Sequence, residues 1–296
     1  MSLLLSIIIV SFRRMDDLEK CLNSVETRIS EKETVEIIVV DNAGSEQCEA
    51  LSSKYGARYV KSPNNVGVAG GRNLGIAAAR GAYLFFIDDD AEIATPDFDR
   101  LIREAFNDNI GILAFRVLNY YSNSPNPGEL PFRYRNESQL MNSRFVSYFV
   151  GTGFALKRTA IQDTGFFFED YFYAVEELDY SYRALSRNWR IYYLADVLVM
   201  HKKSPIRITG KKQYYYQMRN RCIISAKFFP FPYYLTYIAY WALTLFILSF
   251  RDNAVREWGD GILKGIGCFL RYRRTANIVD SKTIDYIKNN EGRIWY

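Results

Sequence analysis

Residues 83–90 have the sequence YLFFIDDD, an apolar and aromatic run that stops at three consecutive carboxylates. A short run of this kind predicts a buried β-strand. In open α/β sheets, ligands bind just outside the carboxyl ends of the strands. Adjacent carboxylates repel one another unless a cation or hydrogen-bond donors offset their charge. A solvated acidic turn is the plain alternative, but the surrounding sequence favours a site for a hard divalent metal ion, which prefers oxygen ligands.

Strand-like and helix-like patterns alternate on the N-terminal side of this segment. Leu4–Val10, Glu36–Val40 and Ala57–Val60 are short apolar runs that predict strands. Residues 15–27 carry apolar side chains at helical spacing, and the small residues of 71–80 predict another helix. The order βαβαβαβ predicts an α/β fold with a mostly parallel central sheet flanked by helices. We expect residues 1–227 to form this domain.

The middle of the chain is less regular. A loop rich in Pro, Asn and Ser near residues 120–136 predicts a flap that faces a substrate, because long loops in compact domains are usually functional. The remaining predicted elements are strands at Ile110–Phe115, Tyr148–Lys157, Arg190–Leu194 and Val197–Met200, and a helix at 176–187.

Residues 228–296 predict a helical extension of different character. Tyr233 to Phe250 is uncharged, rich in Tyr, Trp, Leu and Ile, and is followed by Arg251. It is near the lower length limit for a membrane-spanning helix, and its aromatic residues are typical of a membrane interface. A buried core helix is the alternative. We expect shallow, peripheral contact with the inner leaflet rather than a span.

Charge and cysteine content limit the partners and the compartment. The net charge is +5, but Lys202 to Lys227 contains eight Lys or Arg and no acid, which favours phosphates or anionic lipid. No nucleic-acid motif accompanies this basic run, so we expect no nucleic-acid partner. The four widely spaced cysteines include no C-x-x-C pair and predict reduced thiols. Leu3 to Val10 is too short for a signal peptide, so we expect a cytoplasmic protein.

Two further segments contain candidate ligand contacts. Asp41 ends the second predicted strand, where it would either cap a turn or accept a hydrogen bond from a base or ribose. Residues 64–73, NNVGVAGGRN, predict a small-residue loop that opens a helix and lets backbone approach a phosphate. Close packing of helix on sheet is the alternative for Gly70 and Gly71, whereas Arg72 and Asn73 are harder to explain by packing.

Acidic residues and a single histidine follow later in the chain. Residues 172–180, FYAVEELDY, place Glu176 and Glu177 at a helix start, where they would complement the helix dipole or supply a general base. His201 is the only histidine and follows a predicted strand. A single histidine is usually a polar structural residue, but the acidic cluster makes His201 a candidate metal ligand.

Taken together and in this order, these segments resemble the family 2 glycosyltransferases, inverting enzymes of the GT-A fold that use a nucleotide-sugar donor. The likeness covers residues 4–225, and an ordered set of motifs is more specific than any one of them. The glycine-rich segment is most similar to that of bacterial rhamnosyltransferases of surface polysaccharide assembly. The matching elements are SIIIVSFRR at 6–14, IVVDN at 38–42, NxGxxGGxNxG at 65–75, DxD at 88–90, GxF at 165–167 leading to EExD at 176–179, and His201.

The resemblance implies roles for individual residues. Asp90 would bind Mg²⁺ or Mn²⁺ carrying the donor diphosphate, and His201 would add a metal or phosphate contact. Arg219, in the basic run, would help to close over the diphosphate or hold a lipid-diphosphate acceptor, although a solvated basic face explains it equally well. The other nucleotide contacts would be Ser11, Phe12, Arg14 and Asp41 around the base, Arg72 and Asn73 beside the nucleotide, and Asp88 with Asp89 near the ribose.

Glu177 lies at the position of the family's catalytic base. The family more usually has Asp there, which leaves Glu176 and Asp179 as candidates for the same role. The implied reaction moves a sugar, with inversion, from a dTDP- or UDP-sugar to a hydroxyl of a glycan or lipid-diphosphate-linked acceptor. The resemblance places this reaction in cell-surface polysaccharide synthesis, at the cytoplasmic face of the membrane.

Three other classes of protein remain as alternatives. A catalytically inactive sugar-nucleotide-binding protein would not need competent residues at every chemical position, and this chain has them. A nucleotidyltransferase would need a glycine-rich, basic phosphate loop directly after the first strand, where this chain has Ser11-Phe12-Arg13-Arg14. A purely structural membrane-associated protein would leave the aligned acids without a reason.

Overall fold

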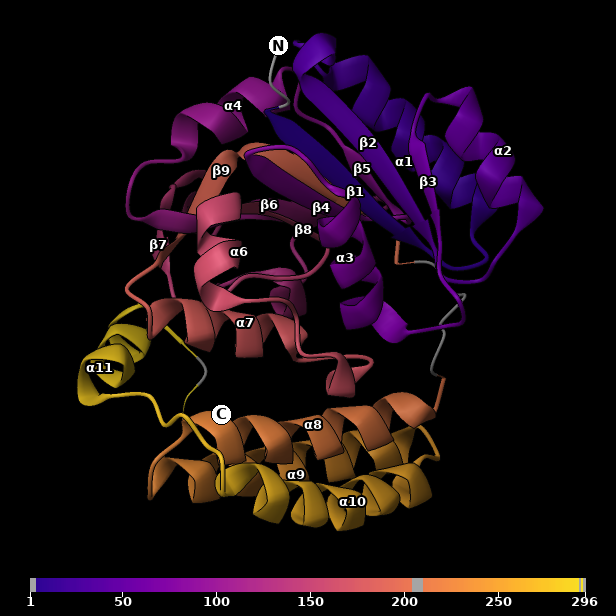
Figure 1. Cartoon of the computed structure of the whole chain (residues 1–296). Helices are drawn as coiled ribbons and strands as arrows, with labels where there is room; N and C mark the ends of the chain where they lie inside the picture. Colours follow the sequence, from indigo (N-terminus) through magenta and orange to yellow (C-terminus); the bar gives the residue numbers. More distant parts are fainter. Residues whose placement is uncertain (1–3, 204–209, 293, 295–296) are drawn as a thin grey trace.

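The computed structural model describes residues 4–203, 210–292 and 294, and these form a central sheet covered by helices (Figure 1). Within these residues the sheet has nine strands in the order β3-β2-β1-β4-β8-β6-β9-β5, with β7 paired to β9. The strands are β1 (Leu5–Ser11), β2 (Val35–Asp41), β3 (Arg58–Lys61), β4 (Tyr83–Asp88), β5 (Ala91–Ile93), β6 (Ile110–Asn119), β7 (Arg144–Val146), β8 (Gly153–Lys157) and β9 (Arg190–His201).

The predicted mostly parallel sheet is confirmed for the strands that build the N-terminal half. β1 pairs in parallel with both β2 and β4, β2 with β3, and β6 with β9. The short strands β5 and β7, together with β8, pair antiparallel. As a result the carboxyl ends of β1, β2 and β4 meet at one edge, which is where an open α/β sheet binds ligands.

Helices pack on both faces of the sheet and bury alternate residues of each strand. In β1, Ile8 belongs to one core, whereas Ile7 and Ile9 belong to the other, because side chains of a strand alternate between faces. The first core contacts α3, α6, α7 and α8, and the second contacts α1, α2 and α4. These helices are α1 (Met15–Arg28), α2 (Glu46–Lys54), α3 (Gly67–Ala78), α4 (Phe98–Ala105), α6 (Arg158–Thr164), α7 (Glu176–Leu185) and α8 (Lys212–Phe228).

Three predictions of local structure were wrong in detail. The segment 64–73 is helical from Gly67, so most of it is the first part of α3 rather than a loop. Gly71 packs there against β1: a Cβ at this position would lie 2.6 Å from Cγ1 of Val10. β8 begins only at Gly153, because residues 147–152 form a bend and a turn instead of extended strand. Arg190–His201 is one strand, which continues through the interruption predicted between residues 194 and 197.

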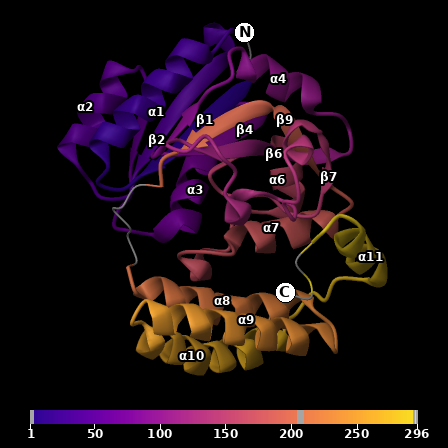
Figure 2. The same ribbon diagram turned by 180° about the vertical axis from the view of Figure 1, so that it is seen from behind.

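The C-terminal part forms a separate helical layer below the sheet (Figures 1 and 2). It contains α9 (Tyr233–Arg251) and α10 (Val255–Arg273), which pack against α8. α11 (Ser281–Asn289) returns to the sheet domain, where Ile284 and Ile287 join the first core and the hydroxyl of Tyr286 donates to the carbonyl oxygen of Val146. The amide of Asn220 on α8 donates to carbonyl oxygens of Tyr171 and Tyr173, and this ties the layer to the segment before α7. α8 thus connects the two parts, while a boundary at residue 227 remains our proposal.

Candidate active site

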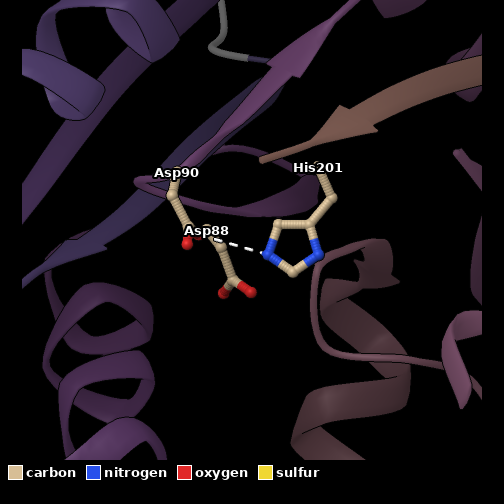
Figure 3. Close-up of side chains that lie close together, drawn as sticks. All are labelled: Asp88, Asp90 and His201. Carbon is tan, nitrogen blue, oxygen red and sulfur yellow. Dashed lines mark ion pairs between the residues drawn. The ribbon is translucent and has the colours of Figure 1, made fainter. Parts of the chain in front are cut away.

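The acidic cluster that the sequence predicts lies at the carboxyl end of β4. β4 ends at Asp88, and β5 begins at Ala91 after a two-residue turn. β5 pairs antiparallel with β9 so that Ala91 lies opposite His201. This pairing brings the imidazole beside the acids, as Figure 3 shows. One ligand atom from each of Asp88, Asp90 and His201 lies within 4.8 Å of the other two.

Arg14 and Asp89 support this cluster from the first strand. Arg14 lies just after β1, and its Nη1 is 2.6 Å from Oδ2 of Asp90 while its Nη2 is 2.6 Å from Oδ1 of Asp89. Asp89 is fully buried and also accepts a hydrogen bond from the backbone N–H of Phe12 at 3.2 Å. Burial raises the pKa of Asp89 to about 7, although Arg14 opposes the shift. Asp89 therefore holds Arg14 and the β1 end in place rather than facing a ligand.

Glu129 orients His201 and was missed by the sequence analysis. Oε1 of Glu129 lies 3.1 Å from Nδ1 of His201, while Nε2 of the same ring lies 3.3 Å from Oδ1 of Asp90. Lys203 Nζ also lies 3.1 Å from Oε1 of Glu129. Burial lowers the pKa of His201, but the adjacent carboxylates of Asp90 and Glu129 outweigh burial and raise the pKa to about 10. The only signal in the sequence was that Glu129 lies within the loop predicted to face a substrate.

The donor atoms of this cluster suit a hard divalent cation. Two carboxylates and one imidazole nitrogen are ligands that Mg²⁺ and Mn²⁺ accept. Oδ2 of Asp90 is held by Arg14, which leaves Oδ1 on the side of His201. The carboxylate that holds the far side of the ring is the usual second partner of a metal-binding histidine. The residues therefore fit a divalent metal.

A second group of carboxylates lies around Arg72. This arginine is buried on α3, and its Nη1 lies 3.1 Å from Oε1 of Glu176 and 3.4 Å from Oε1 of Glu177. Its Nη2 donates to the carbonyl oxygen of Gly151 at 3.0 Å and lies 3.9 Å from Oδ1 of Asp88. One guanidinium thus spans the strand end that carries the acidic cluster and the start of α7. Arg72, expected beside the nucleotide, directly contacts the candidate base.

Gly151 makes this close arrangement sterically possible. A Cβ at position 151 would lie 2.1 Å from Oε1 of Glu177 and 2.4 Å from Nη2 of Arg72, and real side chains do not approach so closely. An alanine there would therefore separate Arg72 from Glu177. The sequence contains no pattern that marks this glycine, because the contact joins segments far apart in the chain.

The three candidate bases differ in their surroundings. Glu176 is buried, and burial together with the neighbouring charge of Glu177 raises its pKa, although Arg72 opposes the shift. Glu177 is the most accessible, with its side chain 18% exposed. Asp179 is fully buried and is contacted by Lys227 and, at 2.6 Å, by Nε of Arg183. Burial raises the pKa of Asp179, but Arg183 and Lys227 outweigh it and hold the pKa below its usual value.

Ser11 and Asp41 lie side by side at the ends of β1 and β2, and both are fully buried. The carboxylate of Asp41 accepts hydrogen bonds from the backbone N–H groups of residues 43, 44 and 45, at 2.8, 2.9 and 2.5 Å. It also accepts one from the hydroxyl of Tyr59 at 2.9 Å. Of the two roles left open for Asp41, the structure shows the turn cap directly.

Asn73 and Arg219 make contacts outside the acidic cluster. The amide of Asn73 exchanges two hydrogen bonds with the backbone of Phe167, each 2.9 Å long, and so holds the segment before α7. Arg219 on α8 donates to the carbonyl oxygens of Asp170 and Tyr171. The structure therefore places both beside the support of α7 rather than with Asp88 and Asp90.

The strand-end acids, the histidine and the carboxylates around Arg72 are the features of a glycosyltransferase built on a nucleotide-binding α/β sheet. A model of the family "Glycosyl transferase family 2" matches residues 6–165, more than half of the chain. The chain belongs to this family, and the resemblance predicted from the sequence is confirmed.

Two proteins similar in sequence are named as glycosyltransferases. The low-salt glycan biosynthesis hexosyltransferase Agl10 of Haloferax volcanii is 27% identical over 240 residues, which cover 76% of each protein. The glycosyltransferase AglE of the same organism is 22% identical over 217 residues, covering 71% of this chain and 70% of AglE.

Solved structures share the GT-A fold. S. aureus TarS 1–349 in complex with UDP-GlcNAc superposes with a TM-score of 0.62 at 16% identity, covering 96% of this chain and 84% of that one. The mannosyltransferase PcManGT of Pyrobaculum calidifontis, in complex with GDP-Man and Mn²⁺, gives 0.56 at 12% identity, covering 96% and 78%. Against a longer S. aureus TarS structure the chain spans 50% of the length, with a TM-score of 0.64 at 17% identity.

Proposed function

We propose that the protein is a metal-dependent inverting glycosyltransferase that moves a sugar from a nucleotide-diphosphate donor to a hydroxyl of its acceptor. The observation that supports this most strongly is the bridge through Arg72, which contacts Glu177 and also approaches Asp88 of the candidate metal cluster. A base and a diphosphate site must lie on opposite sides of one anomeric carbon for inversion. Arg72 connects groups suited to these two tasks.

The residues that would hold the metal are Asp88, Asp90 and His201, with Glu129 behind the histidine. When bound, a divalent ion supplies positive charge that stabilises the nucleoside diphosphate leaving group. Arg14 holds one oxygen of Asp90, so the carboxylate presents the other in a defined direction. The structural neighbours solved with Mn²⁺ support a divalent ion, Mg²⁺ or Mn²⁺, at this site.

Glu177 is our candidate for the general base. Its carboxylate would take the proton of the acceptor hydroxyl while that oxygen forms a bond to the anomeric carbon, and the bond from this carbon to the donor diphosphate breaks on the opposite face. Arg72 contacts Oε1 of this carboxylate, and the Glu177 side chain remains partly exposed. Asp179 is unsuited to this role because two cations and the hydroxyl of Tyr171 already occupy it. The raised pKa of Glu176 favours a neutral side chain that shares Arg72.

We propose that the nucleotide lies along the ends of β1, β2 and β4. Phe12 and Arg14 would form the wall nearest the metal, and Ser11 has a buried hydroxyl with no partner among the described residues. Asp41 would shape the base pocket through the turn that it caps. Asn73 and Arg219 would contribute indirectly, by holding the chain that leads into α7.

We also propose that the acceptor is a glycan or a lipid-diphosphate-linked sugar of cell-surface polysaccharide synthesis, and that the protein acts at the cytoplasmic face of the membrane. The name of the relative Agl10 supports a role in glycan biosynthesis. Neighbours solved with UDP, UDP-GlcNAc and GDP-Man support a nucleotide-sugar donor, and we expect a UDP- or dTDP-sugar. The family match decides against the nucleotidyltransferase and the purely structural alternatives.

The test is the thermal stabilisation of the protein by UDP, dTDP and GDP, each with and without Mn²⁺. A ligand that binds only the native state stabilises it by about 2.7 kcal/mol at a concentration 100 times its Kd. We expect one nucleotide to raise the melting temperature only with Mn²⁺, and Asp90→Ala to abolish this rise. Asp285→Asn, on the exposed surface of α11, is the matched control. If a nucleotide raises the melting temperature equally without Mn²⁺ and in Asp90→Ala, the metal site is contradicted.

Turnover separates an enzyme from an inactive binding protein. The nucleotide identified by stabilisation defines which nucleotide-sugars to incubate with the protein and Mn²⁺, and release of the free nucleoside diphosphate is then measured. We expect release from one sugar donor. Tight donor binding without release, in the presence of acceptor extracts, would favour the inactive alternative.

A further inference from the structure

α9 and α10 expose large apolar side chains on their outer surfaces. On α9, Leu243 and Phe250 are 62% and 74% exposed, and Ile247 lies between them on the same face. On α10, Leu263 is 72% exposed and begins a similar row. We call these exposed side chains the outer face; its members are Leu235, Tyr240, Leu243, Phe246, Ile247 and Phe250 of α9, with Leu263, Ile266 and Leu270 of α10.

These side chains form one surface because the two helices are packed together. Phe246 of α9 contacts Trp258 of α10, with ring centroids 4.9 Å apart, and Tyr234 contacts Phe269 with a centroid distance of 5.4 Å. In both views of the molecule, α9 and α10 lie on the side of α8 away from the sheet (Figures 1 and 2). Large contiguous apolar surfaces of this kind mark sites of interaction with a protein or a membrane.

The opposite side of α9 packs against the rest of the protein. α9 is the one helix of the described chain that is long and apolar enough to cross a membrane. However, Tyr237 and Leu245 are buried, and the guanidinium of Arg221 on α8 lies 3.7 Å from the centroid of the Trp241 ring. α9 therefore lies along α8 and α10, and its apolar side faces outward. This arrangement suits a helix that lies in the plane of a membrane interface.

A basic hollow borders the outer face and indicates the charge of the partner. It has a volume of about 340 Å³ and lies between α8, α10 and the chain near Asp170. Arg219, Lys264 and Arg271 line it, and the carboxylate of Asp170, which accepts from the hydroxyl of Tyr272, is the acid among its lining residues. Three basic side chains therefore line the hollow together with one carboxylate. Clustered cations repel one another unless an anion offsets them.

Leu263 joins the two features, because it lines the hollow and is also the most exposed apolar residue of α10. An apolar surface beside a site for an anion matches a lipid bilayer with acidic headgroups, in which a phosphate lies directly above acyl chains.

We propose that the outer face docks on an anionic lipid bilayer, with α9 and α10 parallel to its plane, and that the hollow formed by Arg219, Lys264 and Arg271 binds a lipid phosphate. This site differs from the shallow contact expected from residues 233–250 alone, since α10 contributes three of the nine apolar side chains and two of the three phosphate ligands, Lys264 and Arg271. The proposal does not depend on the sugar transfer reaction.

The test is flotation of the full chain with vesicles of phosphatidylcholine, with or without phosphatidylglycerol. We expect binding to the vesicles that contain phosphatidylglycerol, weakened by added salt. Each basic residue near an anionic surface contributes about 1 kcal/mol, or about fivefold in affinity, so Lys264→Gln with Arg271→Gln should weaken binding by at least about tenfold. The matched control is Lys20→Gln with Lys32→Gln, which removes the same charge from the sheet domain.

Ile247→Asn with Leu263→Asn tests the apolar half of the surface. Both side chains are exposed, so the fold should persist, and the thermal melting curve of the variant checks this. We expect loss of binding to the vesicles that contain phosphatidylglycerol. Failure of the wild-type chain to bind any vesicle overturns the proposal, and a dimer abolished by these substitutions would identify a second copy as the partner instead. Unchanged binding by the Lys264 and Arg271 variant overturns the headgroup site.

Discussion

The strand-end site and the helical layer depart from the usual distribution of side chains in opposite ways. The site buries charge: Asp89, Glu176 and Arg72 are all nearly inaccessible to solvent. The layer exposes apolar surface, for example Leu243 and Phe250. Globular proteins generally bury apolar groups and expose charged ones, so both departures need a reason. The site compensates with ion pairs inside the protein, whereas the outer face has no such compensation within the described chain.

The comparison indicates that the two regions bind different kinds of partner. Charges paired through Arg72 and Arg14 point to a ligand that enters the protein. The exposed apolar side chains of the outer face instead indicate that this face of the protein docks on another surface. The predictions below test whether each departure is functional or structural, and they run from the largest expected effect to the smallest.

Glu177→Gln should have the largest effect. A general base contributes about 10²- to 10⁴-fold to a rate, so we expect kcat to fall by this factor with little change in donor affinity. Glu176→Gln is the matched control, because it removes the neighbouring carboxyl of the same size. We expect it to retain most of the activity, since burial already favours its neutral form. Measured transfer rates that reverse this order would assign the base to Glu176.

Asp179→Asn tests a buried charge that we regard as structural. It would leave Arg183 and Lys227 without their carboxylate, and breaking a buried pair in this way costs about 3–5 kcal/mol of unfolding free energy. Because the folded-state pKa of Asp179 is lowered, its contribution is present above its ordinary pKa and is lost as the pH falls through the lowered value. Chemical denaturation of both proteins between neutral and strongly acidic pH should therefore show their stabilities converging in acid. A variant as stable as wild type at neutral pH would mean that the pair is not structural.

Two leucines on opposite sides of α9 sharpen the contrast within one helix. Leu245 is 2% exposed, and Leu245→Ala should cost about 2–5 kcal/mol of unfolding free energy because it leaves a cavity. Leu243→Ala removes the same atoms from the outer face and should change stability by less than about 0.5 kcal/mol. Urea denaturation measures both. Equal losses would show that Leu243 is packed in solution, and the outer face would then be an internal or oligomeric contact.

Glu129→Gln should have a smaller effect on the metal site. The partner that orients a metal-binding histidine typically contributes about 10- to 100-fold to metal affinity. We expect Mn²⁺ affinity, measured by titration calorimetry, to fall by this factor. The control is Glu137→Gln, which changes an exposed glutamate later in the same part of the chain and should leave the affinity for Mn²⁺ unchanged. An unaffected Glu129→Gln protein would show that the contact with His201 does not survive metal binding.

Much of the fold could be predicted from the sequence because its signals are local. The apolar runs of β1, β2 and β4 and the helical spacing in α1 are visible within windows of a few residues, and the structure confirms them. The start of α3 was misplaced because glycine and other small residues resemble a loop. The division of residues 190–201 into two strands was wrong, because β6 pairs with β9 on both sides of the interruption, Phe115 with Leu194 and Arg116 with Leu198, and residues 195–197 form an irregularity within one strand.

The amino-acid sequence by itself determined the alternation of strands and helices, the three acids at and directly after the end of β4, and the candidate bases at the start of α7. Only the tertiary structure decided which of these meet. The pairing of β5 with β9 brings His201 to Asp90, and Arg72 reaches Glu177 from a helix more than a hundred residues earlier. The tertiary structure also decided that Asp179 forms ion pairs with Arg183 and Lys227 and that one side of α9 is exposed to solvent. The physical reason is that periodicity reports on neighbours along the chain, whereas pairing and exposure depend on the packing of segments that the sequence keeps apart.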